Sequence, residues 1–180
     1  MSGVRQISRA DYVLSPMIRH NVRTAQTTRG NNMKLVVAID GEQSAQTALE
    51  HILKEKYASD TEMHLIHVIV PGFADAPNEG IPDVVAIEKK EEQAVLDNMA
   101  RKLKESLNIN ASLEILEGET AQVISHACKQ FDADEVIVPS HARHGFSRLW
   151  FGSVAEEIVG AAPCTVMVLK MPQDKAVSSR

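Results

Sequence analysis

Short apolar runs alternate along the chain with longer amphipathic segments, and this alternation constrains the fold more than any other feature. Five short runs that contain valine, isoleucine and leucine are predicted to be strands, and the first of them is typical of a strand buried on both faces. They are Lys34–Ile39, Glu62–Val70, Ala111–Gly118, Asp134–Ser140 and Cys164–Lys170. Four segments between them are predicted to be helices, namely Ser44–Tyr57, Asp83–Leu107 (with Pro82 as an alternative start), Thr120–Phe131 and Gly152–Ala162. This order predicts an α/β protein with a parallel sheet, right-handed crossovers and helices on both faces.

The apolar residues of the first three helical segments recur at helical spacing, which predicts the face that each helix turns toward the sheet. These residues are Ala45, Ala48, Leu49 and Ile52, then Leu96, Met99, Ala100, Leu103 and Leu107, then Ala121, Ile124, Ala127 and Cys128. A chain of 180 residues is long enough to bury a core of this kind in one domain.

Residues 1–32 differ in composition from the rest of the chain. They hold five arginines and one acidic residue, which gives them a net charge of +4. The net charge of the whole chain is −5, so residues 33–180 carry a net charge of −9. We predict a basic N-terminal extension over 1–32, an α/β domain over 33–171 and a polar tail over 172–180. An apolar cluster lies inside the extension at Tyr12, Val13, Leu14, Met17 and Ile18. The extension is interpreted either as a disordered tail or as an arm that docks on a partner.

The bulk properties exclude several classes of protein. The negative net charge argues against a general nucleic-acid binder. Two cysteines, Cys128 and Cys164, are too few for a disulfide framework and favour reduced, buried thiols in the cytoplasm. No apolar run approaches the ~20 residues of a membrane-spanning helix, so membrane insertion is not expected.

The stretch Ile137–Val159 is typical of a phosphate-binding connection. A buried strand ends in a polar loop, and Gly152-Ser153 then opens a helix. Ligands of doubly wound sheets bind outside the carboxyl ends of the strands, where the strand order switches. A helix N-terminus at that place favours an anion.

The chain from Met33 to Lys170 resembles the universal stress protein family. The segments that carry the resemblance are VVAIDGEQSAQTAL, LIHVI and SHARHGFSRLWFGSVAEEIVGAAPCTVMVLK. The resemblance implies an open five-stranded parallel sheet of order 3-2-1-4-5. It also implies a homodimer formed through the last strand, where the Val166 and Val168 regions of two copies would pair. One branch of this family binds ATP.

The resemblance also implies a set of nucleotide-binding residues. Carried over by position, they are Asp40, Val68, Ser140, His141, Ala142, Arg143, Gly152 and Ser153. Two glycines of the family's ATP motif are replaced here by Pro139 and Ala142. Proline has no N–H to donate, and the alanine methyl narrows the approach of a phosphate. Two interpretations stay open: a weakened ATP or AMP site, and a purely structural connection in which Ser153 caps a helix.

We therefore expect a universal-stress-type regulatory protein that binds ATP or AMP weakly and requires no cofactor. The alternative is an interaction protein that binds no nucleotide and docks on a larger assembly through residues 1–32 and its dimer surface. We expect no enzyme, although weak ATP hydrolysis is left open. A hydrolase triad of Asp40, Ser153 and a histidine is disfavoured because the sequence has no nucleophile elbow. A zinc site from His126, Cys128, His141 and His144 is disfavoured because the spacing fits no zinc pattern.

Overall fold

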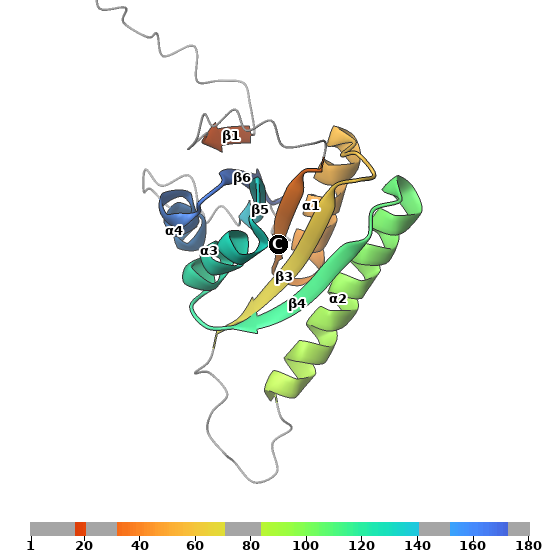
Figure 1. Ribbon diagram of the computed structural model, residues 1–180. Helices are drawn as coiled ribbons and strands as arrows, with labels where there is room; N and C mark the ends of the chain where they lie inside the picture. Colours follow the sequence, from red (N-terminus) through yellow and green to blue (C-terminus); the bar gives the residue numbers. More distant parts are fainter. Residues whose placement is uncertain (1–16, 21–31, 71–83, 141–151, 173–180) are drawn as a thin grey trace, which may run out of the picture.

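The computed structural model describes residues 17–20, 32–70, 84–140 and 152–172 (Figure 1). Its strands are β1 Met17–His20, β2 Lys34–Ile39, β3 Glu62–Ile69, β4 Ala111–Glu117, β5 Glu135–Ser140 and β6 Thr165–Lys170. Its helices are α1 Gly41–Glu55, α2 Val84–Leu107, α3 Thr120–Phe131 and α4 Ser153–Ala161. Among the helices of these ranges, none combines the length and apolar composition needed to cross a bilayer.

The strands form one sheet in the order β1-β6-β5-β2-β3-β4. The five strands from β2 to β6 are parallel and follow the predicted order 3-2-1-4-5, which confirms the fold expected from the sequence. The sixth strand, β1, was not predicted. It comes from the N-terminal extension and lies antiparallel to β6. Part of the extension is therefore a component of the sheet.

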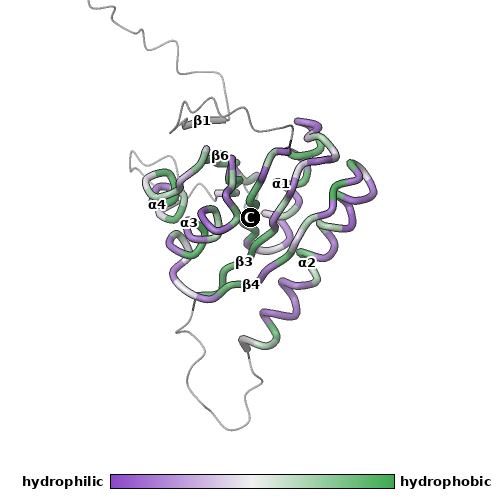
Figure 2. Tube along the Cα trace, viewed as in Figure 1, coloured by the Kyte–Doolittle hydropathy of each residue, from purple (hydrophilic) through white to green (hydrophobic). Residues whose placement is uncertain are grey.

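The helices cover the sheet on both faces, α1 and α2 on one side and α3 and α4 on the other (Figure 1). One core packs the odd-numbered side chains of β2, such as Leu35 and Val37, against α1 and α2. The second core packs Val36 and Ala38 against α3 and α4. Figure 2 shows the central strands largely in the hydrophobic colour and much of α2 in the hydrophilic one. The apolar run Leu35–Ile39 of β2 is consistent with this double coverage.

The predicted inner faces of the helices are confirmed. Leu96, Met99 and Leu103 of α2 are buried, while Ala100 and Leu107 are half-buried against the same core. The four inner residues predicted for α1 and the four predicted for α3 are all buried. Helix α1 begins three residues earlier than predicted, at Gly41, so its N-terminus lies directly at the end of β2.

Candidate functional site

The ladder between β2 and β5 ends before the carboxyl ends of the two strands, and we call the unpaired edge between these strand ends the β2–β5 crevice. The two strands pair only from Leu35 and Glu135 to Val37 and Ile137. Beyond that point β2 stays paired with β3 as far as Ile39, and β5 stays paired with β6 as far as Ser140. The strands are neighbours at the point where the chain order reverses, so the crevice lies at the switch point where doubly wound sheets bind ligands.

The end of β5 forms one wall of this crevice. The Ser140 carbonyl accepts a hydrogen bond of 3.1 Å from the Met171 N–H, so the backbone polar groups of Ser140 face β6. Successive residues of a strand direct their backbone groups to opposite sides, so those of Pro139 face β2. Pairing with β2 has already ended there. Proline at position 139 therefore removes no hydrogen bond from the sheet. Any other residue there would have a backbone N–H that points into the crevice.

The N-terminus of α4 is joined to the same wall. The Gly152 N–H donates to the Ser140 hydroxyl over 3.2 Å, and the Ser140 side chain is buried. Gly152 is the N-cap residue and, being glycine, has no side chain with which to cap the first turn. Ser153 follows as an exposed first residue of the helix. The first-turn N–H groups of a helix point out of its end, and the helix dipole favours an anion there.

The end of β2 forms the opposite wall. Asp40 is exposed and is the N-cap residue of α1, but its side chain makes no capping hydrogen bond. Ser44, which is fully buried, instead bonds the backbone on either side of the helix start. Its hydroxyl accepts the Asp40 N–H at 2.6 Å and donates to the Gly41 carbonyl at 2.9 Å. The Asp40 carboxylate is thus presented at the edge of the sheet without a role in the helix cap. Sequence reasoning placed Ser44 in the helix but missed this function.

Val68 lies at the same edge, one residue beyond the last pair between β2 and β3, Ile39 with His67. Its half-buried side chain packs on the α3 side of the sheet. The structure therefore brings Asp40, Val68, Ser140, Gly152 and Ser153 to the carboxyl edge, although they are far apart in the sequence. The predicted residues His141, Ala142 and Arg143 lie outside the described residues.

A histidine and two glutamates beside the crevice were not predicted. The ring of His67 is buried, with Nδ1 at 2.9 Å from the Ile39 carbonyl oxygen. Glu92 of α2 accepts the Gly41 N–H at 3.3 Å and lies 3.5 Å from the same ring nitrogen, while Glu88 lies 4.0 Å from Nε2. The spacing of Glu88 and Glu92, four residues apart on α2, puts both on one face of that helix. The sequence does not predict that this face of α2 lies over the carboxyl end of β3, where His67 is.

His64 and His67, both on β3, point to opposite faces of the sheet. His64 stacks on Phe131 of α3 at 5.2 Å and contacts Ser112 and Glu114 of β4, while His67 faces α2. Within the described ranges, no three His, Cys, Asp or Glu side chains are grouped to hold a metal ion. His141 and His144 lie outside those ranges.

The two cysteines lie in the core between the sheet and the helices α3 and α4. Both are buried free thiols. The interaction with Cys164 and burial both raise the pKa of the Cys128 thiol. Cys128 is therefore held in its protonated form.

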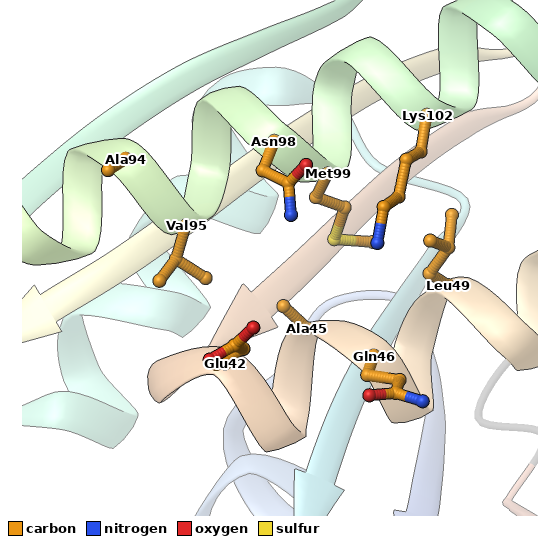
Figure 3. Close-up of a pocket in the computed structure, with 9 residues that line it drawn as sticks. All are labelled: Glu42, Ala45, Gln46, Leu49, Ala94, Val95, Asn98, Met99 and Lys102. Carbon is orange, nitrogen blue, oxygen red and sulfur yellow. The ribbon is translucent and has the colours of Figure 1, made fainter.

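A separate groove of about 250 Å³ lies between α1 and α2 (Figure 3). Ala45, Leu49, Val95 and Met99 supply its apolar atoms, and the polar side chains around them are Glu42, Gln46, Asn98 and Lys102. These residues come from the two helices alone. The groove shares no residue with the crevice between β2 and β5, and it does not contain any predicted nucleotide-binding residue.

The described strands and helices thus form a doubly wound α/β domain with an acid at the end of its first parallel strand and a glycine-serine helix start at the end of β5. The sequence profile described as "Universal stress protein family" matches residues 31–170. The chain belongs to the universal stress protein family. The match spans all five parallel strands and leaves β1 outside it.

Individual relatives agree with this assignment. A universal stress protein of Methanocaldococcus jannaschii is 28% identical over 165 residues, which cover 90% of this chain and 92% of that protein. The structure of hypothetical protein MJ0577 superposes with a TM-score of 0.65 at 22% identity, covering 78% of this chain and 97% of that one. A universal stress protein family protein from Arabidopsis thaliana, solved with AMP bound, superposes with a TM-score of 0.58 at 23% identity. The match covers 82% of this chain and 97% of that one.

Proposed function

We propose that this protein is a universal-stress-type regulatory protein that binds an adenine nucleotide, ATP or AMP, in the crevice between β2 and β5. The observation that carries the proposal is the separation of β2 from β5 beyond Val37 and Ile137. It leaves an exposed carboxylate on one wall and a helix N-terminus on the other. The structure of the Arabidopsis thaliana relative, which has the same fold and was solved with AMP bound, supports the proposal.

The charges around the crevice favour one orientation of the nucleotide. Glu88 and Glu92 lie on the side of α2, so a phosphate placed there would be repelled. The N-terminus of α4 lies on the other side and favours negative charge. Phosphate therefore binds toward Gly152 and Ser153. The ribose hydroxyls, which are hydrogen-bond donors, then lie toward the Asp40 carboxylate, and the base lies toward Val68.

Two features of the β5 wall make the binding weak. The Gly152 N–H already donates to the Ser140 hydroxyl, so a phosphate oxygen must compete with that bond. Pro139 has no N–H, so the crevice lacks one donor on this wall. His141, Ala142 and Arg143 complete the proposed set. We propose binding and regulation in the reducing cytoplasm, without catalysis, where the two buried cysteines stay thiols.

Calorimetric titration with ATP, AMP and cyclic AMP tests this function. We expect measurable heats with ATP or AMP and at least a tenfold loss of affinity in Asp40→Ala, because the ribose loses a charged hydrogen-bond acceptor. Since Asp40 makes no capping bond, the variant should unfold within about 0.5 kcal/mol of the wild type. Asp60→Ala, which removes an exposed aspartate in the turn before β3, is the matched control.

The titration has two results that contradict the proposal. The first is no heat with any of the three nucleotides at millimolar concentration. The second is binding that Asp40→Ala leaves unchanged, which would place the nucleotide somewhere other than the β2–β5 crevice.

A further inference from the structure

Strand β1 covers the outer edge of β6. Met17 lies opposite Leu169 and His20 lies opposite Val166, in an antiparallel register. On its other side β6 is paired along its whole length with β5. Without β1, β6 would be the last strand of the sheet. An edge strand presents a row of unpaired N–H and C=O groups that can pair with another chain. Four residues of the extension therefore cover the central part of that row.

The β6 edge is suited to a second copy of this chain. Val166, Met167, Val168 and Leu169 are all buried, so β6 is apolar on both faces of the sheet. In an antiparallel pair of two β6 strands, a two-fold axis between Met167 and Val168 would place Val166 opposite Leu169 of the partner copy. The pair would be isologous, with the same residues contributed by each copy. It would also span the same four residues that β1 now covers.

We propose that β1 is an intramolecular cap that competes with the β6 strand of a second copy for this edge. The homodimer predicted from the sequence and the pairing seen in the structure need the same hydrogen-bonding groups of β6, so they exclude each other. The chain is a monomer while β1 is in place and dimerises when β1 leaves. This inference is independent of the proposed nucleotide site.

The connection between β1 and β2 is long enough for the cap to leave a folded domain. Thirteen residues separate His20 from Lys34. Fully extended, they span about 43 Å. From β1 across β6 and β5 to β2 there are three strand spacings, about 14 Å in all. The family match also begins only at residue 31, so the five-stranded domain does not include β1.

Strand β1 and the β6 strand of a second copy differ in the backbone entropy that each loses on pairing with the β6 edge. Strand β6 of a second copy is already held extended by β5, whereas β1 lies at the end of a connecting segment and loses backbone entropy when it pairs. The tether gives β1 a high effective concentration at the edge, which a second copy gains only as the protein concentration rises. The proposal therefore predicts a dimer that depends on concentration and on the integrity of β1.

Proline substitution in the full-length chain tests the competition. Successive strand residues direct their N–H groups to opposite sides, so Ile18→Pro with Arg19→Pro removes one N–H that faces β6. The matched control, Arg9→Pro with Ala10→Pro, also adds two prolines and removes one arginine but leaves β1 intact. Sedimentation equilibrium from about 1 to 100 µM should show monomers for the wild type and the control. The β1 variant should dimerise at least tenfold more tightly. Equal masses for all three proteins would overturn the proposal.

Paired cysteines provide a second readout that does not depend on weakening the strand. Ile18→Cys with Val168→Cys, and Arg19→Cys with Met167→Cys, each join residues that lie directly opposite. One of the two pairs is non-hydrogen-bonded, with Cα atoms about 4.5 Å apart, which suits a disulfide. Oxidation by a glutathione disulfide buffer should cross-link at least one pair within a single chain and keep it monomeric. Covalent dimers, or no cross-link in either pair, would contradict an intramolecular cap.

Discussion

Replacing Pro139 by alanine tests how much the missing N–H at this position weakens the affinity for the nucleotide. The backbone groups of Pro139 face β2, at a position along β5 that lies beyond the last residue pair between β2 and β5. Alanine would therefore add an N–H that points into the crevice and would leave every existing hydrogen bond of the sheet in place. The change isolates one donor, because alanine, unlike glycine, adds little backbone freedom.

The expected size of the effect follows from the donor that is gained. A hydrogen bond to a charged group contributes about 1.5–3 kcal/mol, which is roughly tenfold to a hundredfold in affinity. Losing proline at a position that already accommodates it costs about 0.4–1 kcal/mol, through the entropy of the unfolded chain. For a domain of this size the melting temperature should fall by about 1–4 °C. The variant should thus bind ATP and AMP more tightly and melt slightly earlier.

Calorimetry with ATP and AMP, together with thermal unfolding followed by circular dichroism, measures both quantities. Pro163→Ala is the control, since Pro163 is exposed in the turn before β6 and far from β2 in the sheet order. It should lower the melting temperature without changing affinity. Pro139→Gly combined with Ala142→Gly restores both glycines of the family motif and should bind at least as tightly. An affinity that Pro139→Ala leaves within twofold of the wild type, with the fold intact, would refute the reasoning.

Two further predictions concern the framework. Gly118→Ala should destabilise the domain by about 2–3 kcal/mol in urea unfolding, because Gly118 has φ of +143° and a Cβ there would meet Val123 Cγ2 at 2.8 Å. Gly160→Ala, in open space on α4, should instead stabilise by about 0.5 kcal/mol, and equal effects at both sites would contradict the geometry. Tyr57→Phe should cost about 1–2 kcal/mol, since its hydroxyl donates to the buried Glu135 carboxylate over 3.1 Å, and an unchanged urea midpoint would show that this bond contributes nothing.

The parallel sheet was predictable because its local signals agree with one another. Each strand from β2 to β6 is short, is rich in apolar residues or, in β4, alternates them with polar ones, and is followed or preceded by an amphipathic helix. Periodicity and composition therefore point to the same topology. The carboxyl-edge positions Asp40, Val68 and Gly152 could be placed from the sequence once the strand ends were known. The site residues at the edge were thus found through the fold and the family resemblance.

Other features depend on contacts that the sequence does not encode locally. Strand β1 is only four residues long and comes from a segment rich in arginine, serine and threonine, so it gives no alternation from which to predict a strand. Glu88 and Glu92 belong to an evidently helical segment, but their position over the end of β3 is set by how α2 crosses the sheet. The role of Ser44 depends on where α1 begins, and helix boundaries are the least certain part of a sequence-based prediction.

The two functions considered for this chain use different parts of the sheet. The crevice lies between β2 and β5, whereas the capped edge lies on the far side of β6, so β5 and β6 separate the two. A nucleotide contacting Asp40 and Gly152 would leave the outer edge of β6 untouched, and exchange of β1 for a second copy would leave the β2–β5 divergence in place. Binding and assembly can therefore occur together, and any influence of one on the other must pass through β5 and β6. Linkage makes such an influence reciprocal: if AMP changes the dimerisation constant, the dimer must bind AMP with correspondingly altered affinity.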